Sequence, residues 1–127
     1  AEVPDGGVVV LDAGAVTERL AARLPVDRGY TVVTNSVSVA SVLAPRTDVV
    51  VHLIGGRLDR RAGAAVATDR ELEGLSADVA FVVPGGVSFE RGLTSVDPVQ
   101  GRSKRALMDA ARTVVVLAEH TRIDHDR

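Results

Sequence analysis

A lysine on the apolar side of a predicted helix carries the clearest binding chemistry in this sequence. Lys104 lies three and four residues before Leu107 and Met108, so the three side chains share one face of an α-helix. A cation in the first half of a helix gains nothing from the helix dipole, which favours cations near the C-terminus. We therefore interpret Lys104 as a candidate ligand for an anion. The alternative is a lysine whose methylene groups cover the core while the ammonium reaches solvent.

Asp97 opens the same predicted helix and forms with Lys104 the sharpest charged pair of the sequence. Asp97 followed by Pro98 is typical of an N-cap and a first helical position. We expect capping to be part of the role of Asp97. A carboxylate and an ammonium on one helix could also bind a polar ligand without catalysing any reaction.

A turn of small residues, Asp12-Ala13-Gly14-Ala15, follows the first aliphatic run of the chain. It leads into a predicted helix, and the free backbone N–H groups at a helix N-terminus bind anions. Gly14 and Ala15 would let a ligand approach closely. Asp12 would repel a phosphate placed against it, so we expect it to accept a hydrogen bond from a ligand hydroxyl or from those N–H groups. A plain N-cap is the alternative interpretation of this turn.

A second polar turn, Thr34-Asn35-Ser36, follows the next aliphatic run. Asn35 offers a ligand both a donor and an acceptor, and Ser36 is a good N-cap for the helix that comes after it. Local turn chemistry would explain Thr34 and Asn35 equally well.

Glycine pairs end two further aliphatic runs. Gly55 and Gly56 are followed by Arg57, and Gly85 precedes Gly86. Paired glycines permit a positive φ or a close approach of a ligand to the backbone, and Arg57 could reach an anionic group. Such a sequence more often forms a simple turn with its arginine in solvent. We keep Gly55, Gly56, Arg57 and Gly85 as candidate binding residues.

Aliphatic runs and amphipathic segments alternate along the chain and must position these turns. The order predicts a layered α/β domain with a parallel sheet and right-handed crossovers. In such sheets ligands bind at the carboxyl ends of the strands, so the turns should gather at one pocket. Residues 57–68 are interpreted as a loop, 69–75 as one or two helical turns, and 87–96 as a loop or short hairpin. The predicted strands are 8–11, 31–33, 49–54, 79–83 and 114–117, and the predicted helices are 14–24, 37–44 and 98–112.

The composition excludes several classes of protein. The 127 residues, 46% of them hydrophobic and 25% charged, suit one globular domain. Aromatic residues make up 2% and the net charge is −2, which disfavours surfaces that stack bases or grip a phosphate backbone. The sequence has no cysteine and no apolar run of membrane-spanning length, so we expect a cytoplasmic protein without disulfides. The histidines lack metal-ligand spacing and no catalytic or nucleotide-binding motif stands out, so we expect no metal, cofactor or catalytic residue.

Taken in order, these strings resemble the C-terminal effector-sensing domain of DeoR-family bacterial transcriptional regulators. The resemblance runs through nearly the whole chain, and its specificity lies in the joint order and spacing of the pieces. These pieces are residues 8–12 with Gly14, 32–36, 53–58, 77–81, 85–87, 92–94, Asp97, 104–108 and 115–118.

The resemblance implies a fold like that of ribose-5-phosphate isomerases and the wider group of sugar-phosphate isomerases and CoA-transferases. It implies that residues 1–127 form one effector-binding domain of a homo-oligomeric regulator of carbohydrate metabolism, most simply a repressor. The effector would be a phosphorylated sugar or a related metabolite. DNA would be contacted by an N-terminal winged helix-turn-helix, which this sequence does not include. The alternative is an isomerase, but the related isomerases carry a Gly-Ala-Asp-Glu stretch and a Lys-Gly-Gly loop that this sequence lacks.

The chain departs from the family pattern at the first turn. The family typically has Asp-Ser-Gly-Thr-Thr, whereas this sequence has Asp12-Ala13-Gly14-Ala15-Val16. Hydroxyls that could bind phosphate are therefore missing, and each hydrogen bond of that kind to a charged group is worth about 1.5–3 kcal/mol. Gln100 also replaces an acidic residue before Lys104. The resemblance predicts the position of the pocket, and it leaves the preferred effector open.

Overall fold

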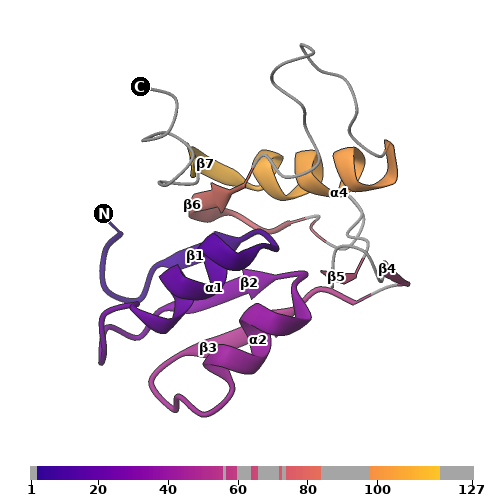
Figure 1. The fold of residues 1–127 in the computed structure, drawn as a ribbon. Coiled ribbons are helices and arrows are strands. Elements are labelled where there is room, and N and C mark those ends of the chain that lie inside the picture. The colour runs from indigo at the N-terminus through magenta and orange to yellow at the C-terminus, as the bar shows by residue number, and fades with distance from the viewer. Residues whose placement is uncertain are drawn as a thin grey trace, which may run out of the picture.

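A five-stranded parallel sheet organises the described part of the chain (Figure 1). The computed structural model describes residues 3–55, 57–59, 64–65, 72, 74–83 and 98–117. The strand order is β3-β2-β1-β6-β7, so the first strand of the sequence lies in the centre. The strands are β1 Val8–Leu11, β2 Thr31–Thr34, β3 Val50–Leu53, β6 Ala77–Val82 and β7 Ala111–Val116, and the helices are α1 Ala15–Ala22, α2 Val37–Leu43 and α4 Pro98–Asp109.

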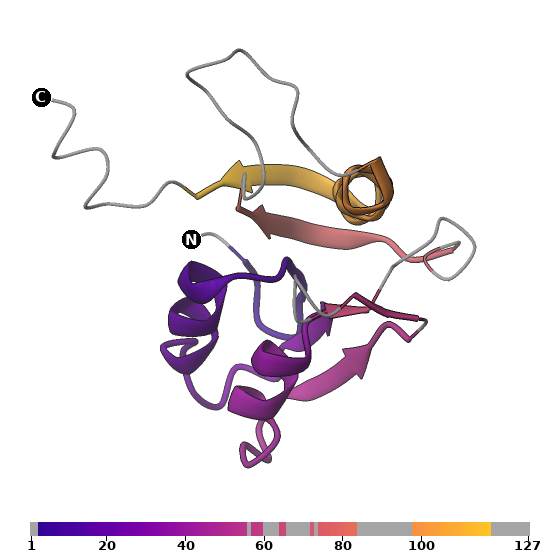
Figure 2. The same ribbon diagram turned by 45° about the vertical axis from the view of Figure 1, so that its right-hand side comes forward.

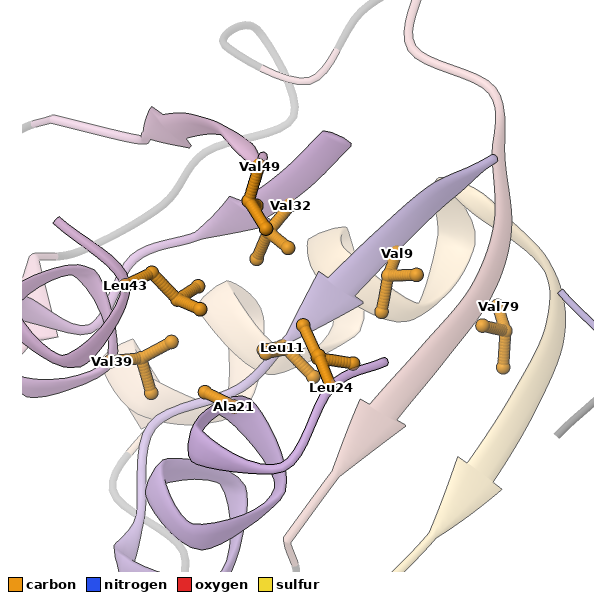
Figure 3. Close-up of a cluster of buried hydrophobic side chains, with 9 residues drawn as sticks. All are labelled: Val9, Leu11, Ala21, Leu24, Val32, Val39, Leu43, Val49 and Val79. Atoms are coloured by element: carbon orange, nitrogen blue, oxygen red, sulfur yellow. The ribbon is translucent and has the colours of Figure 1, made fainter. Parts of the chain in front are cut away.

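Helices cover both faces of the sheet, as the alternation of strand and helix predicts. Side chains of a strand point alternately to opposite faces, and those of β1 divide in this way. Val9 and Leu11 pack with α1 and α2 in one core cluster (Figure 3), whereas Val10 packs with α4 in the other. Figure 2 shows α1 and α2 together on one side and α4 apart from them. The predicted layered α/β architecture with a parallel sheet is therefore confirmed.

The predicted C-terminal end of the last helix is wrong. The helix predicted over residues 98–112 ends at Asp109, and Ala111 and Arg112 belong to β7. Ala111 pairs with Ala77, and the Ala77 N–H donates to the carbonyl of Ala110 at 2.9 Å. Pairing with a neighbouring strand thus overrides the helical spacing at these two positions.

The prediction of a loop over residues 57–68 is wrong in part. Leu58–Asp59 (β4) and Ala64–Ala65 (β5) form a small antiparallel pair. β5 lies against the turn after β2, because Ala64 forms a bridge with Ser36 and the Ala65 N–H donates to the Asn35 carbonyl at 2.8 Å. In the segment predicted as helical turns, Leu72 is helical and buried. The segment 87–96 lies outside the described residues.

An arginine clamps the amino-terminal edge of the sheet. Arg46 donates from Nε and Nη2 to the two carboxylate oxygens of Asp48, at 3.1 and 2.6 Å. Its Nη1 donates to the carbonyl of Leu24 at 3.0 Å, and Nη2 donates also to the carbonyl of Pro25 at 3.2 Å. This fork joins the loop after α1 to the loop before β3, and it lowers the pKa of Asp48 to about 2.

Candidate functional site

The ends of β1 and β2 place two polar side chains next to each other at the carboxyl edge of the sheet. Leu11 pairs with Thr34 in the sheet register, so the residues that follow them, Asp12 and Asn35, are neighbours. Both continue the strand alternation that sends Val10 toward the α4 face. They are buried, Asp12 at 4% exposure and Asn35 at 2%. The two side chains therefore meet the middle of α4, at Ser103 and Lys104.

Lys104 of α4 makes an ion pair with Asp12. The Lys104 ammonium donates to Asp12 Oδ2 and, at 2.6 Å, to the carbonyl of Val83 just after β6. The backbone N–H of Val83 donates to the same Asp12 oxygen at 3.0 Å. The Lys104 side chain is 20% exposed and the Asp12 side chain 6%. Removing one member of a buried pair leaves a charge without a partner, so this contact fixes α4 against the ends of β1 and β6.

The Lys104–Asp12 pair keeps unused hydrogen-bonding capacity. An ammonium has three N–H donors, and the described residues accept two of them. Asp12 Oδ1 accepts no hydrogen bond from the part of the chain that the structure describes. A ligand with both donor and acceptor oxygens could therefore bind to Lys104 and Asp12 without separating them.

Asn35 ties the turn after β2 to β5 and α4. Its Nδ2 donates to the Ala65 carbonyl at 2.7 Å and to Ser103 Oγ at 3.3 Å. A carbonyl can only accept, so the nitrogen faces Ala65 and the orientation of the amide is fixed. Asn35 Oδ1 is buried and has no hydrogen-bond partner among the described residues. A buried acceptor left in this way costs about 1–3 kcal/mol.

Thr34 and Ser36 serve the local backbone. The Ser36 N–H donates to Thr34 Oγ1 at 3.0 Å, and Ser36 Oγ accepts from the Val39 N–H at 3.1 Å as the N-cap of α2. The local interpretation of these two residues is thus confirmed. Their hydroxyl oxygens already have backbone partners, so they shape the turn that presents Asn35.

The start of α1 is built without a capping side chain. No side chain of the described residues caps α1 at Gly14, so the interpretation of Asp12 as a cap is wrong. Gly14 has φ 147°, and a Cβ there would lie 3.3 Å from Val83 Cγ2. The Thr17 hydroxyl donates to the Gly14 carbonyl at 2.9 Å and so does not replace the missing hydroxyls. The N–H groups of the first turn keep their capacity to bind an anion, with exposed Ala15 beside them.

Comparison with known proteins assigns the family. All of residues 1–127 match the family model described as the DeoR C terminal sensor domain. The chain belongs to this family. The match agrees with the five-stranded parallel sheet and confirms the resemblance found in the sequence.

The relatives of this sensor domain are transcriptional regulators. The chain is 32% identical over 126 residues to the HTH-type transcriptional repressor GlcR of Bacillus subtilis (strain 168), covering 95% of this chain and 47% of that protein. It is 33% identical over 124 residues to the HTH-type transcriptional regulator GlpR of Haloferax volcanii, with coverages of 96% and 48%. It is 27% identical over 123 residues to the glycerol-3-phosphate regulon repressor of Escherichia coli (strain K12), with coverages of 95% and 49%. The chain thus spans about half the length of these relatives. All three are named as transcriptional regulators or repressors and none as an enzyme. Their names agree with a sensor domain and not with the isomerase alternative.

Within the described residues, no hydrogen bond or ion pair joins the remaining predicted residues to Lys104 and Asp12. Gly55 follows β3 and Arg57 precedes β4, and both are exposed. Arg57 makes no ion pair with the part of the chain that is described. Gly56, Gly85 and Asp97 lie outside the described residues. The structure therefore brings together Asp12, Asn35 and Lys104 from the predicted set.

Sequence reasoning missed Ser103 and Val83. Ser103 is 1% exposed and lies three and four residues before buried Ala106 and Leu107, so the buried face of α4 runs one position earlier than predicted. That spacing could have identified Ser103. Val83 contributes only its backbone N–H and carbonyl to the site. Because every residue except proline has both groups, the residue type could not have identified this contribution.

Neither metal-binding nor membrane-spanning features emerge from the described residues. They contain no group of three or more histidine, cysteine, aspartate or glutamate side chains that could hold a metal ion. No helix among them is both long and apolar enough to cross a membrane.

Proposed function

We propose that this sensor domain binds a small polyhydroxylated effector, a sugar phosphate or a related metabolite, at the carboxyl edge of its sheet. The observation that carries the proposal is the partly buried Lys104–Asp12 pair, which joins α4 to the ends of β1 and β6. Ligands of open parallel sheets bind at this edge. The remaining ammonium proton of Lys104 would donate to an anionic oxygen, and Asp12 would accept from a hydroxyl.

The uncapped start of α1 supports an anionic group on the effector. Its first-turn N–H groups and the positive end of the helix dipole favour negative charge. The name of one relative, a repressor of a glycerol-3-phosphate regulon, supports a phosphorylated polyol as the class of effector.

We further propose that the domain acts within a homo-oligomeric, cytoplasmic repressor of carbohydrate metabolism. Two relatives are named HTH-type regulators, and this chain covers about half of each. A winged helix-turn-helix N-terminal to residue 1 in the full protein would contact DNA. Effector binding would change how α4 is held and so change the arrangement of the DNA-binding parts.

A thermal-shift panel tests the proposal. Ribose 5-phosphate, fructose 1-phosphate, glucose 6-phosphate, glycerol 3-phosphate and inorganic phosphate are added separately to the chain. A compound present at 100 times its Kd stabilises the native state by about 2.7 kcal/mol. We expect at least one organic phosphate to raise the melting temperature and Lys104→Ala to abolish that rise.

The control is Arg105→Ala, which removes an exposed cation from the next position of α4. This variant should keep the full thermal shift. A shift that survives in Lys104→Ala would mean that Lys104 holds α4 against Asp12 and Val83 without binding the effector, and the proposed site would then be wrong. Because Lys104→Ala also leaves Asp12 unpaired, the double variant with Asp12→Asn provides a second protein in which the loss of binding can be measured.

A further inference from the structure

We propose that Asn35 determines specificity by accepting a hydrogen bond from an effector hydroxyl at Oδ1. This inference rests on the proposed function and adds to it which chemical group of the effector the domain recognises. A sensor built in this way selects the hydroxyl pattern of a sugar or polyol, and the anion alone is not sufficient.

The side-chain oxygen of Asn35 is a buried acceptor without a donor among the described residues, and we call it the orphaned oxygen. Asn35 is 2% exposed, and its Oδ1 has no hydrogen-bond partner among the described residues. The amide cannot turn to improve this, because Nδ2 donates to the Ala65 carbonyl at 2.7 Å and exchange of the two atoms would set oxygen against oxygen. Buried polar groups are nearly always satisfied. Oδ1 is therefore held in place for a donor that the described chain does not supply.

The position of Asn35 points to the effector as that donor. Asn35 and Asp12 follow paired residues of β2 and β1. The Asn35 amide contacts Ser103, which precedes Lys104 on α4. The orphaned oxygen thus belongs to the same small region as the Lys104–Asp12 pair, where a ligand of a parallel sheet is expected.

The polarity of the atom identifies the group that would bind. Oδ1 can only accept, and a phosphate dianion likewise offers only acceptor oxygens, so the two would repel each other. A hydroxyl can donate to Oδ1. The polar atoms of the site then divide by chemistry into acceptors, on Asn35 and Asp12, and donors, on Lys104 and in the first turn of α1. A polyol carrying an anionic group at one end matches this division.

The test combines a protein variant with a change in the ligand. The four organic phosphates of the panel are titrated by calorimetry, and the tightest binder is compared with its monodeoxy analogues. In the wild-type chain one analogue should bind about 3- to 10-fold more weakly, as expected for one neutral hydrogen bond. In Asn35→Ala the parent compound and that analogue should bind equally. The control is Ser103→Ala, which removes a partner of Nδ2 and keeps Oδ1, so the difference between the two compounds should persist.

A spectroscopic measurement covers the case in which Asn35→Ala does not fold. A hydrogen bond to Oδ1 shifts the side-chain amide resonances of Asn35 in the wild-type chain, and the parent compound should produce this shift while the discriminating analogue does not. If compounds bind but every analogue keeps the same affinity ratio in wild type and variant, and the amide resonances do not move, the role of Asn35 is refuted and the proposed function stands. If no panel compound binds the wild-type chain, the proposed function fails, and this inference fails with it.

Discussion

Two ion pairs at opposite edges of the same sheet have similar charges and similar burial but differ in their hydrogen bonding. Arg46–Asp48 lies at the amino-terminal edge and Lys104–Asp12 at the carboxyl edge. In each pair the cation also donates to a backbone carbonyl, and the carboxylate also accepts from a backbone N–H. The exposed fractions of the side chains are similar, 18% and 16% for the first pair and 20% and 6% for the second. Burial alone therefore does not distinguish them.

The two pairs differ in how completely they use their hydrogen bonds. The planar guanidinium of Arg46 covers both oxygens of Asp48, as a fork of donors can. The ammonium of Lys104 covers one oxygen of Asp12, and the orphaned oxygen of Asn35 lies at the same edge. A satisfied pair suits a structural clamp, and an unsatisfied group of polar atoms suits a ligand site.

The largest expected effect comes from breaking the pair at the carboxyl edge. Lys104→Met leaves the Asp12 carboxylate buried without its counter-ion. After allowing for the partial exposure of Lys104, we expect the free energy of unfolding to fall by about 2–3 kcal/mol. Urea denaturation measures the change. The double variant with Asp12→Asn should recover most of the loss, and a double variant as unstable as the single one would mean that the loss does not come from the unpaired Asp12 carboxylate.

A smaller effect is expected from Gly14→Ala, which alters the packing beside the pair without removing a charge. An L-residue is strained at the φ of 147° found here, and its Cβ would press on Val83. We expect a loss of about 1–3 kcal/mol, measured by the same denaturation. The exposed glycine Gly55, whose Cβ would meet nothing within 4 Å, supplies the matched control, and an equal loss in Gly55→Ala would argue against a special role for position 14.

The smallest effect is expected at the amino-terminal edge and depends on pH. Hydrogen bonds from Arg46 and from the Asp27 N–H lower the pKa of Asp48 to about 2 from an ordinary value of 3.8. A lowered pKa stabilises the fold above the ordinary value, and this contribution is lost as the pH falls toward 2. The difference in stability between the wild type and Asp48→Asn should therefore shrink between pH 5 and pH 2. Melting curves across this range measure it, and a constant difference would mean that the clamp does not depend on the charge of Asp48.

Much of the fold could be predicted from local signals. The aliphatic runs at residues 8–11 and 31–33 became β1 and β2, and Ser36 was predicted as the N-cap that it is. These features depend on neighbours a few residues away. The β4–β5 pair was missed because it is stabilised by docking on Asn35, about 30 residues earlier in the chain. The helix end at Asp109 was missed because β6 competes for the residues that follow.

The sequence by itself determined the kind of domain and the edge at which its polar residues gather. Strand runs, turn residues and their order depend on residues that are close together in the chain. Only the tertiary structure decided which of those residues meet. Lys104 and Asp12 are 92 positions apart, and their contact depends on how α4 is rotated and placed on the sheet. That placement follows from packing of Ser103, Ala106 and Leu107, one position away from the face that the sequence pattern predicts. The orphaned oxygen of Asn35 has the same origin, because the contact that fixes the amide comes from β5.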